Sequence, residues 1–451
     1  MNELFGLRRK AGFAVKQFRK LKAILLALVL VVCLTAGCGP ETDAGKSEKI
    51  RIQIMTIATP GDGFHDPFVR AIEDYNRTHS DCEVVMTTIE NQLYKEKIQI
   101  YIAGNELPDV FYTWGGGFSQ GFVESGKVLA IDRYYDKYAD ELPEAALVNC
   151  TYNGTLYGVT YVMPVSLAFY NKRAFENAGV TVPTTYEELL TCCQKLKGAG
   201  YVPIGNSVKD SWVLAMLHDG LTLKSVGPER LAKVLTAEEG SYNSEDFITA
   251  SAAVKTIIDN GYMNPNAVEL TNDRCIAKLY DGTAAMYITG SWLAAGFYEK
   301  LGGEYVNVDD PEAFDCFPLP VINSDNAKIT DYMGGAADTL MVASTTKYPD
   351  KAAEVAFELA RSVSKYAYLS GAGVPAWKID YDDSEVPPLP KKVARLASEA
   401  TSFTLWFDTL MTAENKNVYL DLICELYKGT VTPEELCRRM SIQLEKKDVV
   451  E

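Results

Sequence analysis

The sequence predicts an open α/β fold, and its order of elements, its length and its lack of repeats all favour this. Segments with strand-like alternation and segments with helical periodicity follow one another between residues 50 and 112. The 451 residues suit two or three compact units, and no tandem repeat or long low-complexity linker divides them. We therefore expect units joined by several short crossings, with a ligand site beyond the carboxyl ends of the strands.

Each expected element has its own local signal. The expected strands span residues 50–57, 83–89 and 107–112, and the expected helices begin at Pro67 and span residues 92–103. Thr184–Glu187 supplies a capping box for a helix that ends near Gly198 and Gly200. A similar signal at Thr432–Glu435 predicts a last amphipathic helix.

The first 37 residues have the pattern of an export signal. A basic segment precedes an apolar run that begins at Ala23, and residues 34–38, Leu-Thr-Ala-Gly-Cys, resemble the lipobox of bacterial lipoproteins. The resemblance implies cleavage before Cys38 and acylation of that cysteine, which would anchor the protein to the cell membrane outside the cytoplasm. A transmembrane anchor is the weaker alternative, because the uncharged run is shorter than the ~20 residues that a spanning helix needs. Residues 38–48 are small and polar, as in a flexible tether.

Charge and cysteine content exclude some classes of function. The net charge of −16 argues against a nucleic-acid partner and against electrostatic membrane binding. An even number of cysteines follows Cys38, which permits disulfides, but their spacing matches no zinc site. Buried reduced thiols are an equally good interpretation for a chain with a large core.

The sequence carries no recognisable catalytic motif. It lacks the HExxH, GxSxG, Walker and GxGxxG patterns that would follow a strand or open a helix. The three histidines, His65, His79 and His218, lie far apart and have no partner at metal-ligand spacing. We therefore expect no catalytic residue, no cofactor and no metal. An exported glycoside hydrolase is the alternative from the enzyme class, because its two carboxylates need no sequence motif.

Tryptophans beside turns are the strongest candidates for ligand contact. All five follow or precede glycine or other turn residues: Trp114, Trp212, Trp292, Trp377 and Trp406. An indole at the end of a strand can offer a flat apolar face to a sugar ring, while nearby carboxylates and amides bind the hydroxyls. Any single tryptophan is more often part of a core than of a site, so the group carries more weight than each member.

Six segments of the chain match the pattern of one known family: residues 105–132, 152–161, 169–172, 282–292, 334–343 and 429–436. Together they are similar to the extracellular solute-binding proteins of carbohydrate ABC importers (family 1), of which the maltodextrin-binding proteins are well-known members. The resemblance implies a two-lobe periplasmic-binding-protein fold, also called a Venus flytrap, with a hinge between the lobes. It implies one lobe at residues 49–163 plus 337–370, and a second at 164–336 plus 371–451. It also implies a carbohydrate ligand and an ABC transporter permease on separate chains.

The resemblance also assigns ligand-binding residues, with Trp114 and Trp292 as ring platforms on opposite lobes. The assigned residues are Asp62, Phe64, Glu90, Asn91, Trp114, Tyr161, Asp210, Trp212, Trp292, Trp377 and Trp406. Pro164 replaces a carboxylate of the maltodextrin binders, and Gly115-Gly116 replaces a polar pair, so the sugar is not identified.

The alternative within this fold is a non-sugar solute such as a polyol, a glycerol phosphoester or a peptide. A phosphoester binder would gather cations at its site. Only Lys209 and Lys378 lie near the tryptophans in the sequence.

Overall fold

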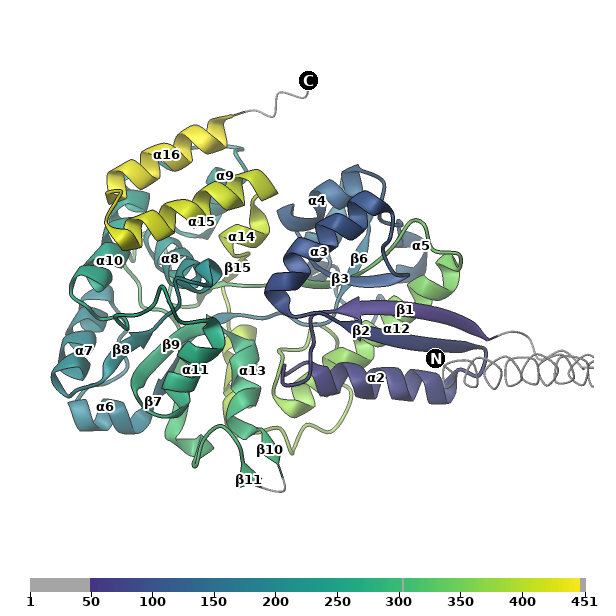
Figure 1. The fold of residues 1–451 in the computed structure, drawn as a ribbon, viewed down its shortest axis with the longest axis horizontal. Coiled ribbons are helices and arrows are strands. Elements are labelled where there is room, and N and C mark those ends of the chain that lie inside the picture. Colours follow the sequence, from purple (N-terminus) through teal and green to yellow (C-terminus); the bar gives the residue numbers. More distant parts are fainter. Residues whose placement is uncertain (1–48, 302–303, 447–451) are drawn as a thin grey trace, which may run out of the picture. The chain divides into compact units, whose positions relative to one another are not determined.

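The computed structural model describes residues 49–301 and 304–446. The expected export signal, the acylation site at Cys38 and the tether lie outside these residues. Within the described ranges, no helix combines the length and the apolar character needed to cross a membrane. The described chain forms two α/β lobes, each built on its own sheet (Figure 1).

The first lobe contains the alternation that the sequence predicts. Its sheet has the strand order β2-β1-β3-β14-β6. The strands are β1 (Ile50–Thr56), β2 (Cys82–Thr88), β3 (Val110–Trp114), β6 (Gly158–Thr160) and β14 (Asp338–Val342). β1 runs parallel to β2 and β3, whereas β14 runs antiparallel to β3 and β6. The helices of this lobe are α2 (His65–Thr78), α3 (Asn91–Gly104), α4 (Gly117–Glu124), α5 (Asp132–Tyr135) and α12 (Pro349–Ser370).

The second lobe has a sheet with the order β12-β7-β9-β8, in which only β8 and β9 are parallel. Its strands are β7 (Ser166–Asn171), β8 (Val202–Gly205), β9 (Ala284–Gly290) and β12 (Phe314–Phe317). Its helices are α6 (Lys172–Ala178), α7 (Tyr186–Gly198), α8 (Ser211–Val226), α9 (Pro228–Leu235), α10 (Glu245–Asp259), α11 (Asn272–Tyr280), α13 (Pro388–Ser398), α14 (Phe407–Leu410), α15 (Ala413–Lys428) and α16 (Pro433–Glu445). Both predicted helix starts are confirmed. Thr432 accepts the backbone N–H of Glu435, whereas the first capping box lies one residue later than predicted, with Thr185 accepting the backbone N–H of Glu188.

Three small two-stranded sheets complete the structure. They are formed by β4 (Thr151–Tyr152) with β5 (Thr155–Leu156), β10 (Lys300–Leu301) with β11 (Glu304–Tyr305), and β13 (Asp331–Met333) with β15 (Ser402–Thr404).

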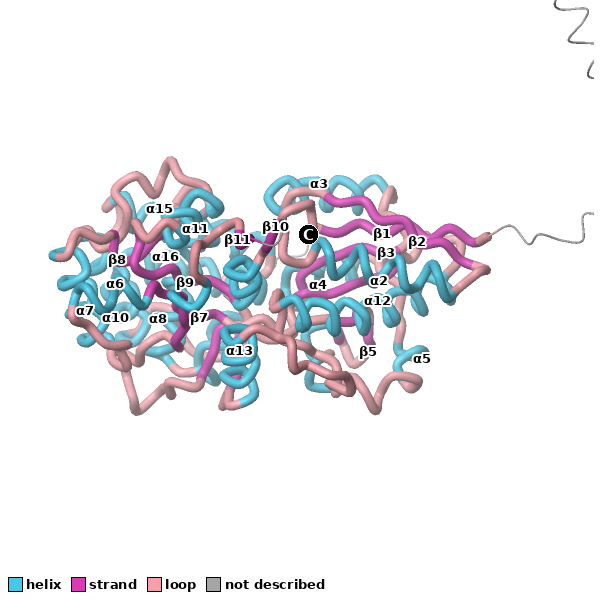
Figure 2. Tube along the Cα trace, turned by 90° about the horizontal axis from the view of Figure 1, so that it is seen from below, coloured by secondary structure: helices cyan, strands magenta, loops and turns pink. Residues whose placement is uncertain are grey.

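The chain passes between the lobes after β6, before β14 and after α12. Figure 2 shows loop segments that join the two lobes beside α13. These crossings lie side by side, since Val162 pairs with Pro375 and Val165 pairs with Gly334. Gly334 has a φ of +140°, and a Cβ there would lie 2.2 Å from the backbone oxygen of Pro164. Only glycine therefore fits this close approach of two backbones.

Each lobe has its own apolar core. The core of the first lobe includes Phe111 and Ile98, and also Ala372, Ala376 and Trp377, which lie past residue 370. In the second lobe, α8 is buried along most of its length and contacts α10 and α15. The cysteines of the described chain are free, and all but Cys424 are buried, which agrees with the reduced-thiol interpretation.

Candidate functional site

A cleft of about 1260 Å³ lies between the lobes, with walls from both. It opens at the carboxyl ends of β1, β2 and β3 in the first lobe and of β9 in the second. Open α/β sheets place ligands at such strand ends, because the following loops and helix starts converge there. Every ligand-binding residue that the sequence analysis assigns, apart from Trp377, lines this cleft.

The wall from the second lobe presents three indoles. The Trp292 ring lies 6.5 Å from the Trp212 ring and 5.7 Å from the Trp406 ring, centroid to centroid, at interplanar angles of 55° and 57°. These tilted contacts bring the three rings together without stacking one face to face on another. Gly290 permits this arrangement, because a Cβ there would lie 2.0 Å from the Trp292 ring. Trp406 is the deepest of the three and is 6% exposed.

The wall from the first lobe presents Trp114 at the end of β3. Its ring makes edge contacts with Tyr112 at 4.9 Å and with Phe118 at 4.8 Å, both measured between centroids. The core of the first lobe therefore holds this indole in place. Trp114 and the other three cleft indoles lie on opposite lobes, so aromatic surface flanks the cleft from two sides.

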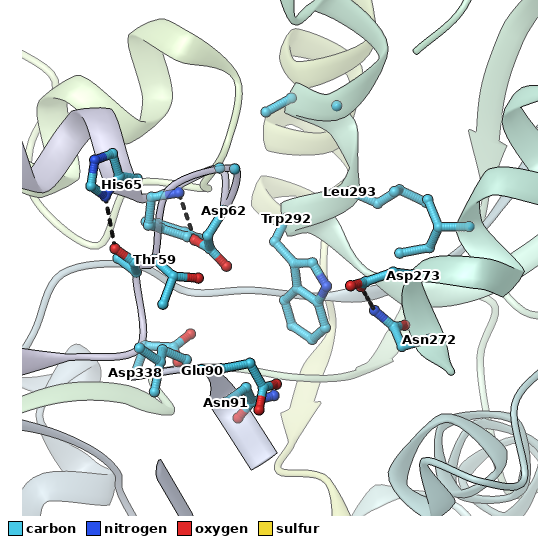
Figure 3. A pocket seen from close by; sticks show the side chains of 18 of the residues that line it. Thr59, Asp62, His65, Glu90, Asn91, Asn272, Asp273, Trp292, Leu293 and Asp338 are labelled. Carbon is cyan, nitrogen blue, oxygen red and sulfur yellow. Dashed lines mark hydrogen bonds between the residues drawn. The ribbon is translucent and has the colours of Figure 1, made fainter. Parts of the chain in front are cut away.

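Carboxylates line the part of the cleft that the first lobe forms. The Tyr112 hydroxyl donates a hydrogen bond to Asp338, the first residue of β14. Burial and the nearby Asp62 raise the pKa of Asp338 to about 6, while the Tyr112 hydrogen bond opposes this rise. Burial also raises the pKa of Asp62, whose Oδ1 accepts the backbone N–H of Phe64 at 2.8 Å. Both carboxyl groups lie on one side of Trp292 in Figure 3.

Further polar groups are held at helix starts. Glu90 caps α3 by accepting the N–H groups of Gln92 at 3.0 Å and Leu93 at 3.1 Å. The neighbouring Asn91 Oδ1 is buried and has no hydrogen-bond partner within residues 49–301 and 304–446, so it is an acceptor suited to a ligand hydroxyl. Asp210 of the second lobe accepts the N–H of Asn272 at 2.6 Å.

Trp377 was assigned to the site, and the structure corrects this. Its side chain is 5% exposed and packs in the core of the first lobe. Its Nε1 donates to the backbone oxygen of Thr160 at 2.9 Å, which ties the crossing after α12 to β6. The turn before Trp377 belongs to the paired crossings, where Met163 N–H donates to Val374. An indole that follows glycine and proline in the sequence therefore anchors a crossing between the lobes here, and does not line the cleft.

Some cleft residues were not expected from the sequence. Asp338, Asp273, His65 and Lys95 line the cleft, whereas Lys209 and Lys378 do not. Asp338 comes from a strand that enters the sheet antiparallel, so its first residue, not its last, faces the cleft. Lys95 lies one turn beyond Asn91 on α3. Helical spacing from Asn91, which the sequence analysis assigns to the site, is the signal that could have identified it.

The histidines do not form a shared site. His65 lines the cleft with its Nδ1 2.9 Å from the backbone oxygen of Ala58. His218 lies in the core of the second lobe, hydrogen-bonded to Tyr419 and Ser251, and burial lowers its pKa to about 3. His79 stacks on Tyr75. Across the described parts of the chain, no three or more His, Cys, Asp or Glu side chains form a group suited to a metal ion.

Residues 61–369 match the family model described as "Bacterial extracellular solute-binding protein". A solved structure with TM-score 0.82 is 31% identical, and the alignment covers 87% of this chain and 100% of the other. Its description concerns xylan utilization by the thermophilic bacterium Caldanaerobius polysaccharolyticus.

Two curated proteins extend this similarity to sugar binders. The "Multiple sugar-binding protein" of Streptococcus mutans is 21% identical over 386 residues, which cover 84% of this chain and 87% of that protein. The "Melibiose/raffinose/stachyose-binding protein MelE" of Bacillus subtilis is 22% identical over 322 residues, which cover 70% and 71% of the two chains.

Proposed function

Because the chain belongs to the family of bacterial extracellular solute-binding proteins, we propose that it captures a carbohydrate between its lobes and delivers it to an ABC transporter permease. The observation that supports this most directly is the cleft itself, in which indoles from both lobes flank a floor of carboxylates and amides. Aromatic faces bind the apolar C–H surface of a sugar ring, and the polar groups bind its hydroxyls.

The mechanism in this proposal is binding without covalent chemistry. A sugar that contacts Trp114 on one lobe and Trp292 on the other interacts with both only when the lobes approach each other. The bound carbohydrate therefore favours the closed arrangement by its differential contacts, and the crossings at Val162 and Gly334 act as the hinge.

The ligand in this proposal is an oligosaccharide such as those released from xylan. The cleft volume of about 1260 Å³ exceeds the roughly 300–1,000 Å³ of typical small-molecule sites, which favours several linked rings over one. The relative that is 31% identical is described in connection with xylan utilization, which supports the choice of pentose oligosaccharides.

The proposal also includes a lipid anchor at Cys38, which would keep the protein near its permease and raise the local concentration there. Replacing Cys38 with Ser should then release a soluble protein that carries no acyl chain. Acylated Cys38→Ser protein in the membrane fraction would contradict the anchor.

Thermal melting of the purified chain with a series of oligosaccharides, followed by calorimetry, tests the proposed ligand class. We expect xylo-oligosaccharides to raise the melting temperature, because a ligand that binds only the native state stabilises it. Xylose and non-sugar polyols are the matched comparisons. Stabilisation by a polyol or a peptide, and by no saccharide, would contradict carbohydrate binding. Hydrolysis of the oligosaccharide at sub-stoichiometric protein would indicate a glycoside hydrolase instead.

A further inference from the structure

A buried carboxylate contacts the segment that carries the deepest indole of the cleft. Asp219 of α8 is fully buried and is one of the residues around the cleft. Its Oδ2 accepts the backbone N–H of Phe407 at 3.0 Å, and its Oδ1 accepts the hydroxyl of Tyr419. In the described part of the chain, these are its only hydrogen bonds and no cation pairs with it.

A carboxylate without a cation is costly to keep in a core. Burial raises the pKa of Asp219 well above its ordinary value, and the charge of Asp408 adds to this rise, while the two hydrogen bonds oppose it. An apolar side chain of similar size would avoid the desolvation penalty. A fully hydrogen-bonded buried group can instead fix one arrangement of the elements that it joins. We therefore expect Asp219 to matter for where its partners lie.

The Phe407 N–H belongs to a short turn at the edge of the cleft. In this turn, the backbone oxygen of Trp406 accepts the N–H groups of Thr409 at 2.9 Å and Leu410 at 2.8 Å, and both Trp406 and Thr409 line the cleft. No side chain of the turn caps its start. Asp219 supplies from α8 the acceptor that the first N–H groups of a helix otherwise lack.

The same turn lies against both walls of the cleft. The Trp406 ring is 5.7 Å from the Trp292 ring, centroid to centroid. On the side of the first lobe, a Cβ at Gly117 would overlap the backbone oxygen of Leu410, so two backbones meet there. Gly117 lies three residues after Trp114 in the sequence. A shift of the turn would therefore disturb aromatic surface that a ligand needs.

A chain of hydrogen bonds supports Asp219 from the core of the second lobe. Tyr419 donates to Asp219, so its oxygen accepts from Nδ1 of His218 at 2.9 Å. Burial lowers the pKa of His218 to about 3, so the ring is neutral and its Nε2 accepts from Ser251 Oγ at 3.1 Å. These residues come from α8, α10 and α15, which together hold the carboxylate in one orientation.

We infer that Asp219 is a positioning residue for the ligand, because its bond to the Phe407 N–H holds Trp406 at the cleft. This inference rests on the proposed function, since Trp406 is to contact a sugar chain between the lobes. It adds that the affinity for the ligand depends on an acceptor at position 219, and that this dependence acts through Trp406.

Two substitutions separate the acceptor from the bulk of the side chain. Asp219→Asn keeps an oxygen for the Phe407 N–H, and its NH2 group faces the Tyr419 oxygen, which can accept. Asp219→Leu has a similar size and no acceptor, and Asp219→Ala replaces it if that variant does not fold. By calorimetry with xylotetraose, we expect Asp219→Leu to bind about 10-fold more weakly than the wild type, and Asp219→Asn to lose much less.

A double-mutant cycle tests whether the effect passes through the indole. In a Trp406→Ala background, Asp219→Leu should change the affinity by less than about 2-fold, because the contact that it disturbs is already lost. Ser251→Ala removes a hydrogen bond at the far end of the same network and is the control for a general loss of stability. It should lower the melting temperature and keep the affinity.

Hydrogen exchange at the amides of residues 407–411 supplies a measurement that needs no ligand. Exchange should be faster in Asp219→Leu than in the wild type, and close to the wild type in Asp219→Asn, because only the first loses the acceptor.

Wild-type affinity in Asp219→Leu overturns the inference and leaves the proposed function intact, as does an equal loss in the wild-type and Trp406→Ala backgrounds. If the wild type binds another solute and no saccharide, the proposed function is wrong. Exchange rates that are the same in the wild type and Asp219→Leu would then overturn the positioning role too, whereas faster exchange in Asp219→Leu alone would retain it for the solute that binds.

Discussion

At the scale of single residues, the environment of an indole decides its role. Trp292 lies half-buried in the cleft against two other indoles, whereas Trp377 is 5% exposed and hydrogen-bonded to Thr160. Both follow glycine and turn residues in the sequence, so local sequence alone does not separate them. Long-range packing distinguishes them, so the two tryptophans can be mutated side by side to compare a cleft position with a core position.

Replacing each with Ala should therefore produce opposite effects. Trp292→Ala should weaken oligosaccharide binding by ~1–3 kcal/mol, or roughly 5- to 150-fold, because a stacking face is lost. Trp377→Ala should lower the free energy of unfolding by ~3–5 kcal/mol, because a large core side chain is lost. Calorimetry and chemical denaturation of both variants measure the two effects. A Trp292→Ala protein with unchanged affinity and much lower stability would contradict the assigned role.

The ionisation of Asp338 leads to a second prediction for a single residue, about how the stability of the protein depends on pH. Its pKa is raised to about 6 in the folded protein, so the folded state binds its proton more tightly than the unfolded state does. The resulting cost to stability is complete above about pH 6 and vanishes as the pH falls below the ordinary value near 4.

Asp338→Asn should remove this cost while keeping an acceptor for the Tyr112 hydroxyl. We expect the variant to gain roughly 1–3 kcal/mol of stability at pH 8 and little at pH 4, by denaturation at both values. Asp325→Asn, at an exposed position, is the control and should change little at either pH. An equal gain for Asp338→Asn at both pH values would contradict the ionisation argument.

At the scale of elements, Lys224 joins a buried helix to the loop that precedes β13. The side chain is 2% exposed, and its Nζ donates to the backbone oxygens of Lys328 at 2.8 Å, Ile329 at 3.0 Å and Asp331 at 2.5 Å. The Lys328 oxygen also accepts the backbone N–H of Asp331 at 3.1 Å, so the ammonium adds a second donor there and supplies a donor to the other two oxygens. Taking a donor away from partly buried carbonyls is costly. The lysine therefore fixes the strand pair β13–β15, which leads into the crossing at Gly334.

Lys224→Met keeps the apolar stem and removes the donor. Because three carbonyls then lose the ammonium as a donor, we expect the free energy of unfolding to fall by about 2–4 kcal/mol. Denaturation of the variant measures this, and Lys428→Met at the exposed end of α15 is the surface control. A loss as small as that of the control would indicate that water replaces the ammonium at these oxygens.

At the scale of the whole molecule, the sequence predicts the positions of helices and strands better than it predicts which residues of different elements come together. The elements of residues 50–112 follow from local periodicity, and the helices after Thr185 and Thr432 follow from their caps. Asp338 and Lys95 were missed because their place in the cleft depends on an antiparallel strand far along the chain and on a partner lobe. Trp377 was wrongly assigned to the site for the same reason, because glycine and other turn residues precede an indole both in a crossing between lobes and in a loop that lines the cleft.

The two-lobe arrangement leads to a prediction about the size of the particle. Trp114 packs on the core of the first lobe, while Trp212 and Trp292 pack on that of the second, so neither lobe alone can enclose a sugar. Saturating ligand should therefore reduce the radius of gyration in small-angle scattering, because closure is the only arrangement in which both walls contact the ring. Trp114→Ala, measured at ligand concentrations that still saturate the protein, should compact less, since one of the two walls has lost its face. An unchanged radius of gyration for the wild type with a ligand bound, as checked by calorimetry, would rule out closure as the binding mechanism and place the site on one lobe.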